Sequence, residues 1–181
     1  MRKAIMICMA SFLAMGAMSA QELKFGHINL QEVIFLMEET DSARAVVERL
    51  NRDMQETYNA MVEELNSKYA TYQQMAADWP PATLEAKQSD IQSLEQRIQQ
   101  FQQTANESLN RKQQELFGPI TVKANEAVAK VGKANGLVYI FDLSAGAVPY
   151  VNEAISMNVT DMVKGELNIP LDKQLPAMQQ Q

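Results

Sequence analysis

The sequence predicts an α+β protein, mostly α, with a small β-rich oligomerisation body and a long antiparallel α-helical coiled-coil hairpin as an arm. The first observation is that no glycine occurs between Gly26 and Gly118. The second is that this stretch is rich in Gln, Glu, Ala, Met and Leu, which favour helices. The third is that runs typical of strands occur only at the two ends of the chain.

The N-terminus has the order of a secretory signal peptide. Its first three residues include two cations, residues 4–14 are apolar apart from Ser11, and small residues follow up to Ala20. The apolar run is shorter than the ~20 residues that a membrane span requires. We therefore expect residues 1–20 to be cleaved and the mature chain to be exported and soluble, in an envelope space or outside the cell.

Composition argues against most reactive sites. The formal charge of −6 becomes −8 when the two cations of the leader are removed, which argues against a nucleic-acid partner. The single cysteine, Cys8, lies in the leader, and the single histidine, His27, has no second imidazole for a metal site or a triad. We expect His27 to be a packed strand residue and Asp142 to enter a turn. No catalytic residue, metal or cofactor is therefore expected.

Two long helices are expected in residues 40–117. The adjacent Pro80 and Pro81 divide this stretch, because proline disfavours helical geometry in the residue before it and is tolerated in the first turn of a helix. The tip would lie at residues 78–82, with one helix on each side. Two helices of similar length joined by so short a link most simply fold back on each other.

The first helix carries an apolar stripe that repeats every eleven residues. Eleven residues in three turns gives about 3.67 residues per turn, which keeps the stripe on one face of a nearly straight helix. We expect this face to pack against the Leu and Ile residues of the second helix. The stripe consists of Val47, Leu50, Met54, Tyr58, Met61, Leu65, Tyr69, Tyr72 and Ala76.

Two uses remain open for the aromatic and methionine side chains of the arm. They could hold varied apolar partners, since methionine is adaptable and tyrosine amphipathic, or they could pack helix against helix. The regular period favours packing for the stripe, so Met75, which lies off it, is the better contact candidate. Trp79 could touch a partner or a membrane surface, or cap the hairpin. The candidate binding residues are Met75, Trp79, Tyr72, Tyr69, Met61 and Tyr58.

A discontinuous body is expected from residues 21–39 and 118–171, followed by a flexible tail at residues 172–181. The Gly118-Pro119 step, where the chain returns from the arm, is the predicted hinge: glycine is permissive and proline lacks a backbone donor.

Within the body, residues 23–30 are predicted to form a strand and residues 120–135 a helix. Residues 137–141 and 147–151 are predicted to form a β-hairpin, followed by a short helix at about 160–167. Three short strands make a poor independent core, so we expect strands of several copies to associate. The residues expected in this interface are Phe25, Ile28, Leu137, Tyr139, Phe141, Val148 and Tyr150.

The helical stretch is flanked by KFGHINLQEVI on one side and by AVAKVGKANGLVYIFDLSAGAVPYVN and NVTDMVKGEL on the other. In this order the segments resemble the Skp/OmpH family of periplasmic chaperones. Asn135-Gly136 and Asp142 stand where the family has an Asn-Gly pair and the Asp of a β-hairpin. The segment 158–160 stands where the family often has Asp-Ile-Thr before its last helix.

The resemblance implies a homotrimer shaped like a jellyfish, with a body built from three chains and three arms that enclose a cavity. It implies an ATP-independent holdase that keeps unfolded outer-membrane or exported proteins from aggregating in the periplasm. The best-known members are basic and are credited with a lipopolysaccharide site, which we do not carry over to this acidic chain. The alternative is an envelope adaptor or scaffold that docks a partner through its helical hairpin.

Overall fold

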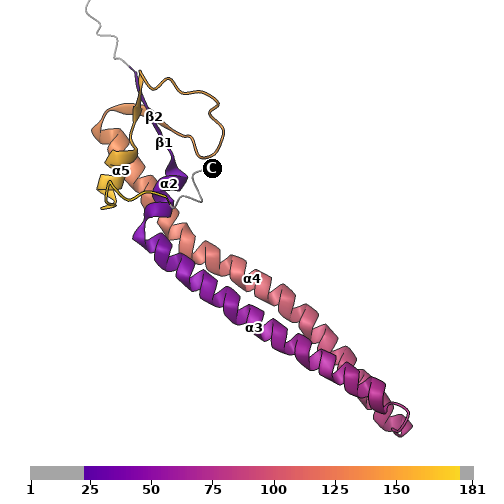
Figure 1. Cartoon of the computed structure of the whole chain (residues 1–181). Coiled ribbons are helices and arrows are strands. Elements are labelled where there is room, and N and C mark those ends of the chain that lie inside the picture. The colour runs from indigo at the N-terminus through magenta and orange to yellow at the C-terminus, as the bar shows by residue number, and fades with distance from the viewer. Residues whose placement is uncertain (1–22, 176–181) are drawn as a thin grey trace, which may run out of the picture.

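The computed structural model describes residues 23–175, which are mostly helical with one small sheet (Figure 1). The predicted signal peptide and residues 176–181 of the predicted tail lie outside the described residues. The elements, in order, are β1 (Lys24–Ile28), α2 (Leu30–Leu36), α3 (Glu38–Met75), α4 (Pro81–Ala134), β2 (Leu137–Asp142), β3 (Ser156–Asn158) and α5 (Thr160–Glu166).

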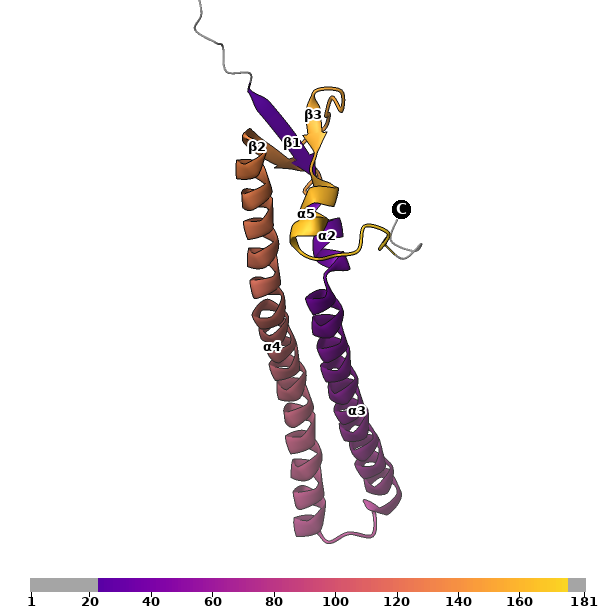
Figure 2. The same ribbon diagram turned by 90° about the vertical axis from the view of Figure 1, so that its left-hand side faces the viewer.

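The two long helices lie side by side and are joined by a short turn at one end, which we call the tip (Figure 2). The sheet, α2 and α5 gather at the other end, which we call the body. Pro80 has extended backbone (φ −59°, ψ 150°), and Pro81 starts α4, where a missing N–H costs no helical hydrogen bond. The proline pair therefore separates the helices for the reason that the sequence indicated.

The predicted end of a helix before Gly118 is wrong. Helix α4 continues without interruption from Pro81 to Ala134 and contains Pro119. A proline inside a helix loses one backbone hydrogen bond and crowds the preceding turn. The residues that follow compensate, because Ile120 and Ala124 are buried in the body (6% and 0% exposed) and hold the next turns in helical form.

The predicted β-hairpin is also wrong. The sheet has the order β2-β1-β3, and both outer strands run parallel to β1. Residues 147–151 form no strand, and the third strand is β3, after a long loop. Pro149 cannot donate to a strand ladder, whereas β3 finds partners along the free edge of β1, so that Phe25 pairs with Ser156.

One face of the sheet packs on α4. A Cβ atom on Gly132 of α4 would lie 3.1 Å from Ile140 Cδ1, so a larger residue there would require the end of the Ile140 side chain to shift by a few tenths of an ångström. The core therefore sits in the body, between the sheet, the end of α4 and the short helices. Its buried residues are Ile28, Val33, Leu36, Met37, Ala43, Ile120, Ala124, Ala127, Val131, Val159, Val163 and Ile169.

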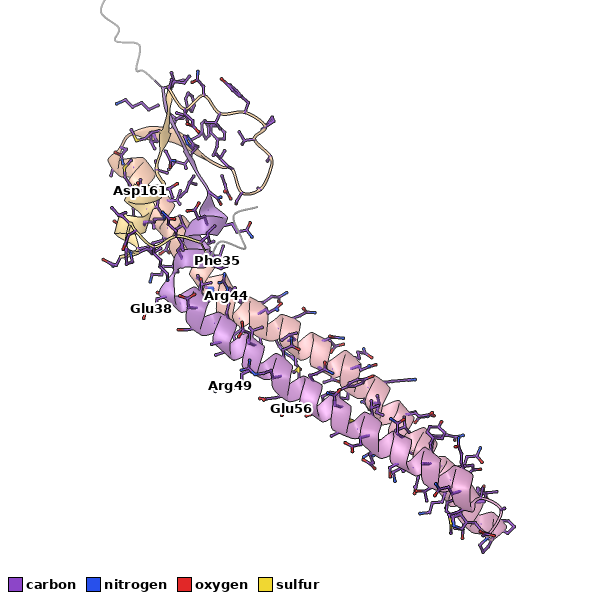
Figure 3. The ribbon with its side chains drawn as sticks, in the orientation of Figure 1. Phe35, Glu38, Arg44, Arg49, Glu56 and Asp161 are labelled. Carbon is purple, nitrogen blue, oxygen red and sulfur yellow. The ribbon has the colours of Figure 1, made fainter. Side chains whose placement is uncertain are left out.

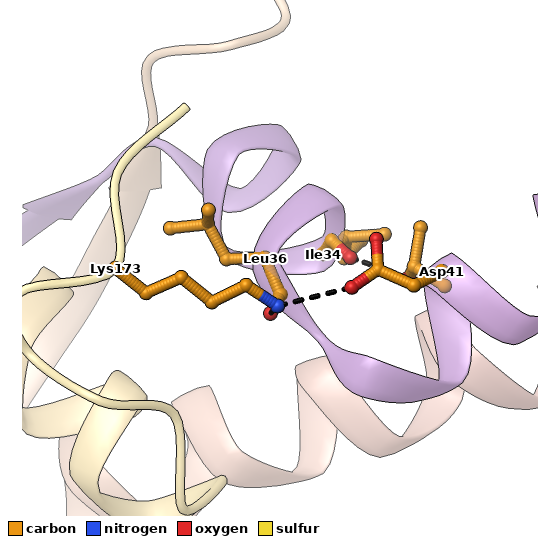
Figure 4. A network of polar contacts seen from close by, with 5 residues as sticks. Ile34, Leu36, Asp41 and Lys173 are labelled. Atoms are coloured by element: carbon orange, nitrogen blue, oxygen red, sulfur yellow. Dashed lines mark hydrogen bonds and ion pairs between the residues drawn. The ribbon is translucent and has the colours of Figure 1, made fainter. Parts of the chain in front are cut away.

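The first residues of the predicted flexible tail are held against the body. Lys173 Nζ donates to the carbonyl oxygen of Leu36 at 2.8 Å and pairs with Asp41 Oδ2 at 3.1 Å (Figure 4). The backbone N–H of Lys173 donates to the carbonyl oxygen of Pro170 at 3.0 Å. Lys173, in the predicted flexible tail, is therefore bonded to the end of α2 and the start of α3.

Candidate functional site

The predicted stripe of α3 lies along the contact with α4. Its residues are half-buried except Tyr69, which is 39% exposed. The Tyr69 hydroxyl donates to Glu95 Oε1 of α4 at 2.6 Å, and this bond to a carboxylate raises the pKa of the Tyr69 hydroxyl. Tyr58, Met61 and Tyr72 thus present only part of their surface to a partner.

The two candidate residues nearest the tip differ in exposure. Met75, the last residue of α3, is 43% exposed. Trp79 is half-buried, and its ring lies 6.0 Å from the ring of Tyr72 at 65°, an edge-to-face contact. It also borders a small pocket of about 180 Å³ together with Lys87 and Ile91 of α4. The sequence left open whether Trp79 touches a partner or membrane surface or caps the hairpin, and this packing favours the cap.

The second candidate surface is the face of the sheet opposite α4, which we call the aromatic face. Phe25 pairs with Tyr139 across β1 and β2, and their rings stack at 6.4 Å and 3°. Phe141 lies 6.4 Å from Phe25 and 6.1 Å from Tyr139. Tyr139 is 62% exposed and Phe141 41%. Three large rings therefore stand together on a surface that residues 23–175 leave open.

A pocket of about 230 Å³ extends the aromatic face towards the loop before β3. It is lined by Phe25, Phe141, Val148, Tyr150 and Ile155, among others, and Tyr150 and Ile155 are each 77% exposed. No sequence pattern points to Ile155, because it lies in an irregular loop without alternating apolar and polar residues.

Two of the predicted interface residues lie elsewhere. Ile28 is 2% exposed in the core, and Leu137 packs against that core. Side chains alternate between the two faces of a strand, and Ile28 is on the inward one. The outward-facing residues of β1 and β2, not these two, make the aromatic face.

Polar groups of the body serve the fold. Asp142 Oδ1 accepts hydrogen bonds from the backbone N–H of Leu30 (3.1 Å) and from the N–H (2.9 Å) and hydroxyl (2.7 Å) of Ser144. Burial acts to raise the pKa of Asp142, but these bonds outweigh it and lower the pKa. His27 is 4% exposed, and its Nδ1 lies 2.9 Å from Ser156 Oγ. Asp142 therefore enters a turn, and His27 is packed in its strand, as the sequence predicted.

The family model described as Outer membrane protein (OmpH-like) matches residues 24–167, from β1 to α5. The chain belongs to the OmpH-like family. Its structure is similar to that of an OmpH-like candidate outer membrane chaperone from Caulobacter crescentus CB15, with a TM-score of 0.68. The two are 14% identical, and the likeness covers 91% of this chain and 98% of the other, so it shows a shared fold. No curated protein matches this chain in sequence.

Metal clusters and membrane-spanning helices are both absent from the described part of this OmpH-like chain. In residues 23–175, no three His, Cys, Asp or Glu side chains gather so as to hold a metal ion. Within the same residues, no helix combines the length and the apolar character needed to cross a membrane. Exposed apolar side chains occur on the arm, as at Met75, and on the aromatic face, as at Tyr139.

Proposed function

We propose that this OmpH-like protein is an ATP-independent periplasmic holdase that binds unfolded outer-membrane or exported proteins and prevents their aggregation. The observation that carries the proposal is the loose packing of the arm. Of the 38 residues of α3, only Thr40 and Ala43 are buried, although its inner face carries methionines and tyrosines. A long surface of partly exposed, adaptable side chains suits the weak, non-specific holding of many different chains.

The proposed assembly is a homotrimer with a shared β-rich body and three antiparallel coiled-coil arms around a cavity. The aromatic face supports self-association, since exposed side chains as large as Tyr139 and Tyr150 are otherwise unfavourable in water. Strands β2 and β3 are both edge strands of the described sheet, and such edges are normally covered or paired. The number three comes from the family resemblance. Sedimentation equilibrium of the mature protein tests it, with a monomer at micromolar concentration as the contradicting result.

We assign client contact to the apolar and aromatic side chains of the arm that remain partly exposed. Met75 is the most exposed of the candidates and is expected to contribute most, whereas Tyr72 and Trp79 also hold the tip together. Export by a cleaved signal peptide would place the protein in the periplasm, where the tips could meet the membrane surface transiently.

Binding is tested with the mature protein and a urea-unfolded β-barrel protein, mixed by dilution without nucleotide. A holdase should give a soluble complex that elutes before either component in size-exclusion chromatography. An adaptor would leave the unfolded protein to precipitate and would retain only a folded partner. This adaptor-like result would contradict the holdase proposal and favour the adaptor alternative.

A further inference from the structure

The contact between the two arm helices is tight near the tip and open in the middle. Near the tip, Ile91, Leu94 and Ile98 of α4 are buried, but the next buried residue of that helix is Ile120. In the opposite helix no residue after Ala43 is buried. In this open part lies a groove of about 420 Å³ between α3 and α4.

The floor of the groove is apolar. It is made by Met54 and Tyr58 of α3 and by Phe101 and Leu109 of α4, all half-buried. Since these side chains are not sealed from solvent, an apolar group that entered the groove would remove their remaining exposed surface from water.

The rim of the groove consists of primary amides. Asn51 and Gln55 border it on α3, and Gln102 and Asn106 border it on α4. No charged residue lines it, and the charged Arg49 and Glu56 project from the side of α3 that faces away from α4 (Figure 3). A primary amide carries two N–H donors and a carbonyl acceptor, so this rim can both donate and accept.

These features select one kind of occupant. The backbone of an unfolded chain presents N–H and C=O groups that lack partners, and amide side chains satisfy both without regard to sequence. A helix from a second copy would have its backbone groups already paired and would leave the rim unused. From Asn51 to Tyr58 the groove follows about 10 Å of helix, which matches about three residues of extended chain.

We propose that this amide-rimmed groove binds short extended segments of unfolded polypeptide, with an apolar side chain on the floor and the backbone bonded to the rim. The inference rests on the proposed holdase function and assigns its contact to a specific part of each arm. Because neither floor nor rim is charged, this contact requires no charge on the client.

Photo-crosslinking at the rim tests the assignment. A benzoylphenylalanine at position 102 is compared with one at position 100, which is two residues away on the same helix and so points about 200° around its axis. The probe is a urea-unfolded β-barrel protein diluted into the full mature protein. Crosslinks to the probe should be several-fold more abundant from position 102. Equal yields, or crosslinks from position 102 only to other copies of this chain, would overturn the groove.

Charge introduced into the rim gives a second test. Gln102→Glu removes two donors and places a carboxylate where neutral amides stand, so the dissociation constant for the unfolded probe should rise roughly three- to tenfold. Gln100→Glu makes the same change on the exposed far side and should leave binding unchanged. If both variants bind like the wild type, the groove is not the binding site, while the holdase function stands. A wild-type protein that binds no unfolded chain would contradict the proposed function itself.

Discussion

Lys173 and Asp41 form an ion pair at 3.1 Å that joins the C-terminal segment to the first turn of α3 (Figure 4). The same ammonium group donates to the carbonyl oxygen of Leu36, the last residue of α2. Between the two helices stands Met37, whose extended backbone (φ −66°, ψ 141°) interrupts the helical path. Lys173 therefore bridges both sides of the joint where the arm leaves the body.

Replacing this lysine should weaken the joint. Lys173→Met removes the ion pair and the bond to Leu36, and because the side chain is partly exposed we expect a loss of about 1 kcal/mol in the free energy of unfolding. Urea titration followed by circular dichroism measures it. Lys112→Met is the matched control: this lysine is 36% exposed against 35% for Lys173, but pairs only with Glu115 on its own helix. Equal losses in both variants would contradict the bridging role.

The predicted hinge at Gly118 gives a second experiment, although α4 runs through it. The wild-type arm should bend there, and spin labels at positions 88 and 133, at opposite ends of α4, should report a broad distance distribution that shifts with client. Gly118→Ala should narrow it, because an added Cβ meets no atom within 4 Å and alanine favours the helix by up to about 1 kcal/mol. Gly165→Ala, in α5 and equally open, is the control and should leave the distribution unchanged. A narrow distance distribution in the wild type that does not change with client would contradict a hinge at Gly118.

The network around Asp142 predicts a dependence of stability on pH. The folded state lowers the pKa of this carboxyl from its ordinary 3.8, so its stabilising effect is complete above that value and is lost as pH falls through the lower, folded pKa. Asp142→Asn should cost about 1–2 kcal/mol at pH 7, and the difference from wild type should shrink in acid below about pH 3.8. The exposed Asp78→Asn serves as control. A difference that is constant from pH 7 to pH 3 would show that the charge of Asp142 is not involved.

Client binding should respond to salt in the direction opposite to that of a basic holdase. Without its predicted leader the chain would carry a formal charge of −8 and repel acidic clients, and salt would screen that repulsion. The affinity for an acidic unfolded client should therefore hold or rise from low to moderate ionic strength. A steep fall in affinity with salt would instead indicate that a charged patch carries the contact.

Apolar contact near the tip is tested separately by serine substitutions. Met75→Ser should weaken holding about two- to fivefold without changing the assembly, because the side chain is exposed and its loss leaves no cavity. Ala77→Ser, nearby and also exposed, is the control. The double change with Trp79→Ser should weaken holding further, and will in addition loosen the tip, since Trp79 packs on Tyr72. Unchanged holding in the double variant would remove both residues from the contact surface.

Local signals in the sequence predicted the features that local physics determines. The proline pair at 80 and 81 separates the long helices, because it acts on the backbone directly. The turn at Asp142 follows from its short acidic side chain, which bonds the backbone two residues on. The eleven-residue stripe faces α4 because its period matches the helix.

Features that depend on distant partners could not be predicted in this way. The sequence predicts helix on both sides of Gly118-Pro119, but it does not show that burial of Ile120 and Ala124 carries one helix through the proline. Residues 147–151 include residue types that favour strands, yet β1 pairs with residues 156–158 instead. The contact of Lys173 with Asp41 joins residues 132 positions apart, and no sequence pattern marks such a pair.

The holdase function itself is measured by light scattering during dilution of a urea-unfolded β-barrel protein. We expect the mature protein, without nucleotide, to suppress the scattering at a ratio of about one assembly to one client molecule, and added ATP to change nothing. The Gln102→Glu variant should need a several-fold higher concentration for the same effect, and Gln100→Glu should not. Scattering that stays at the level of the client alone, even at a large molar excess of the wild-type protein, would contradict the holdase function.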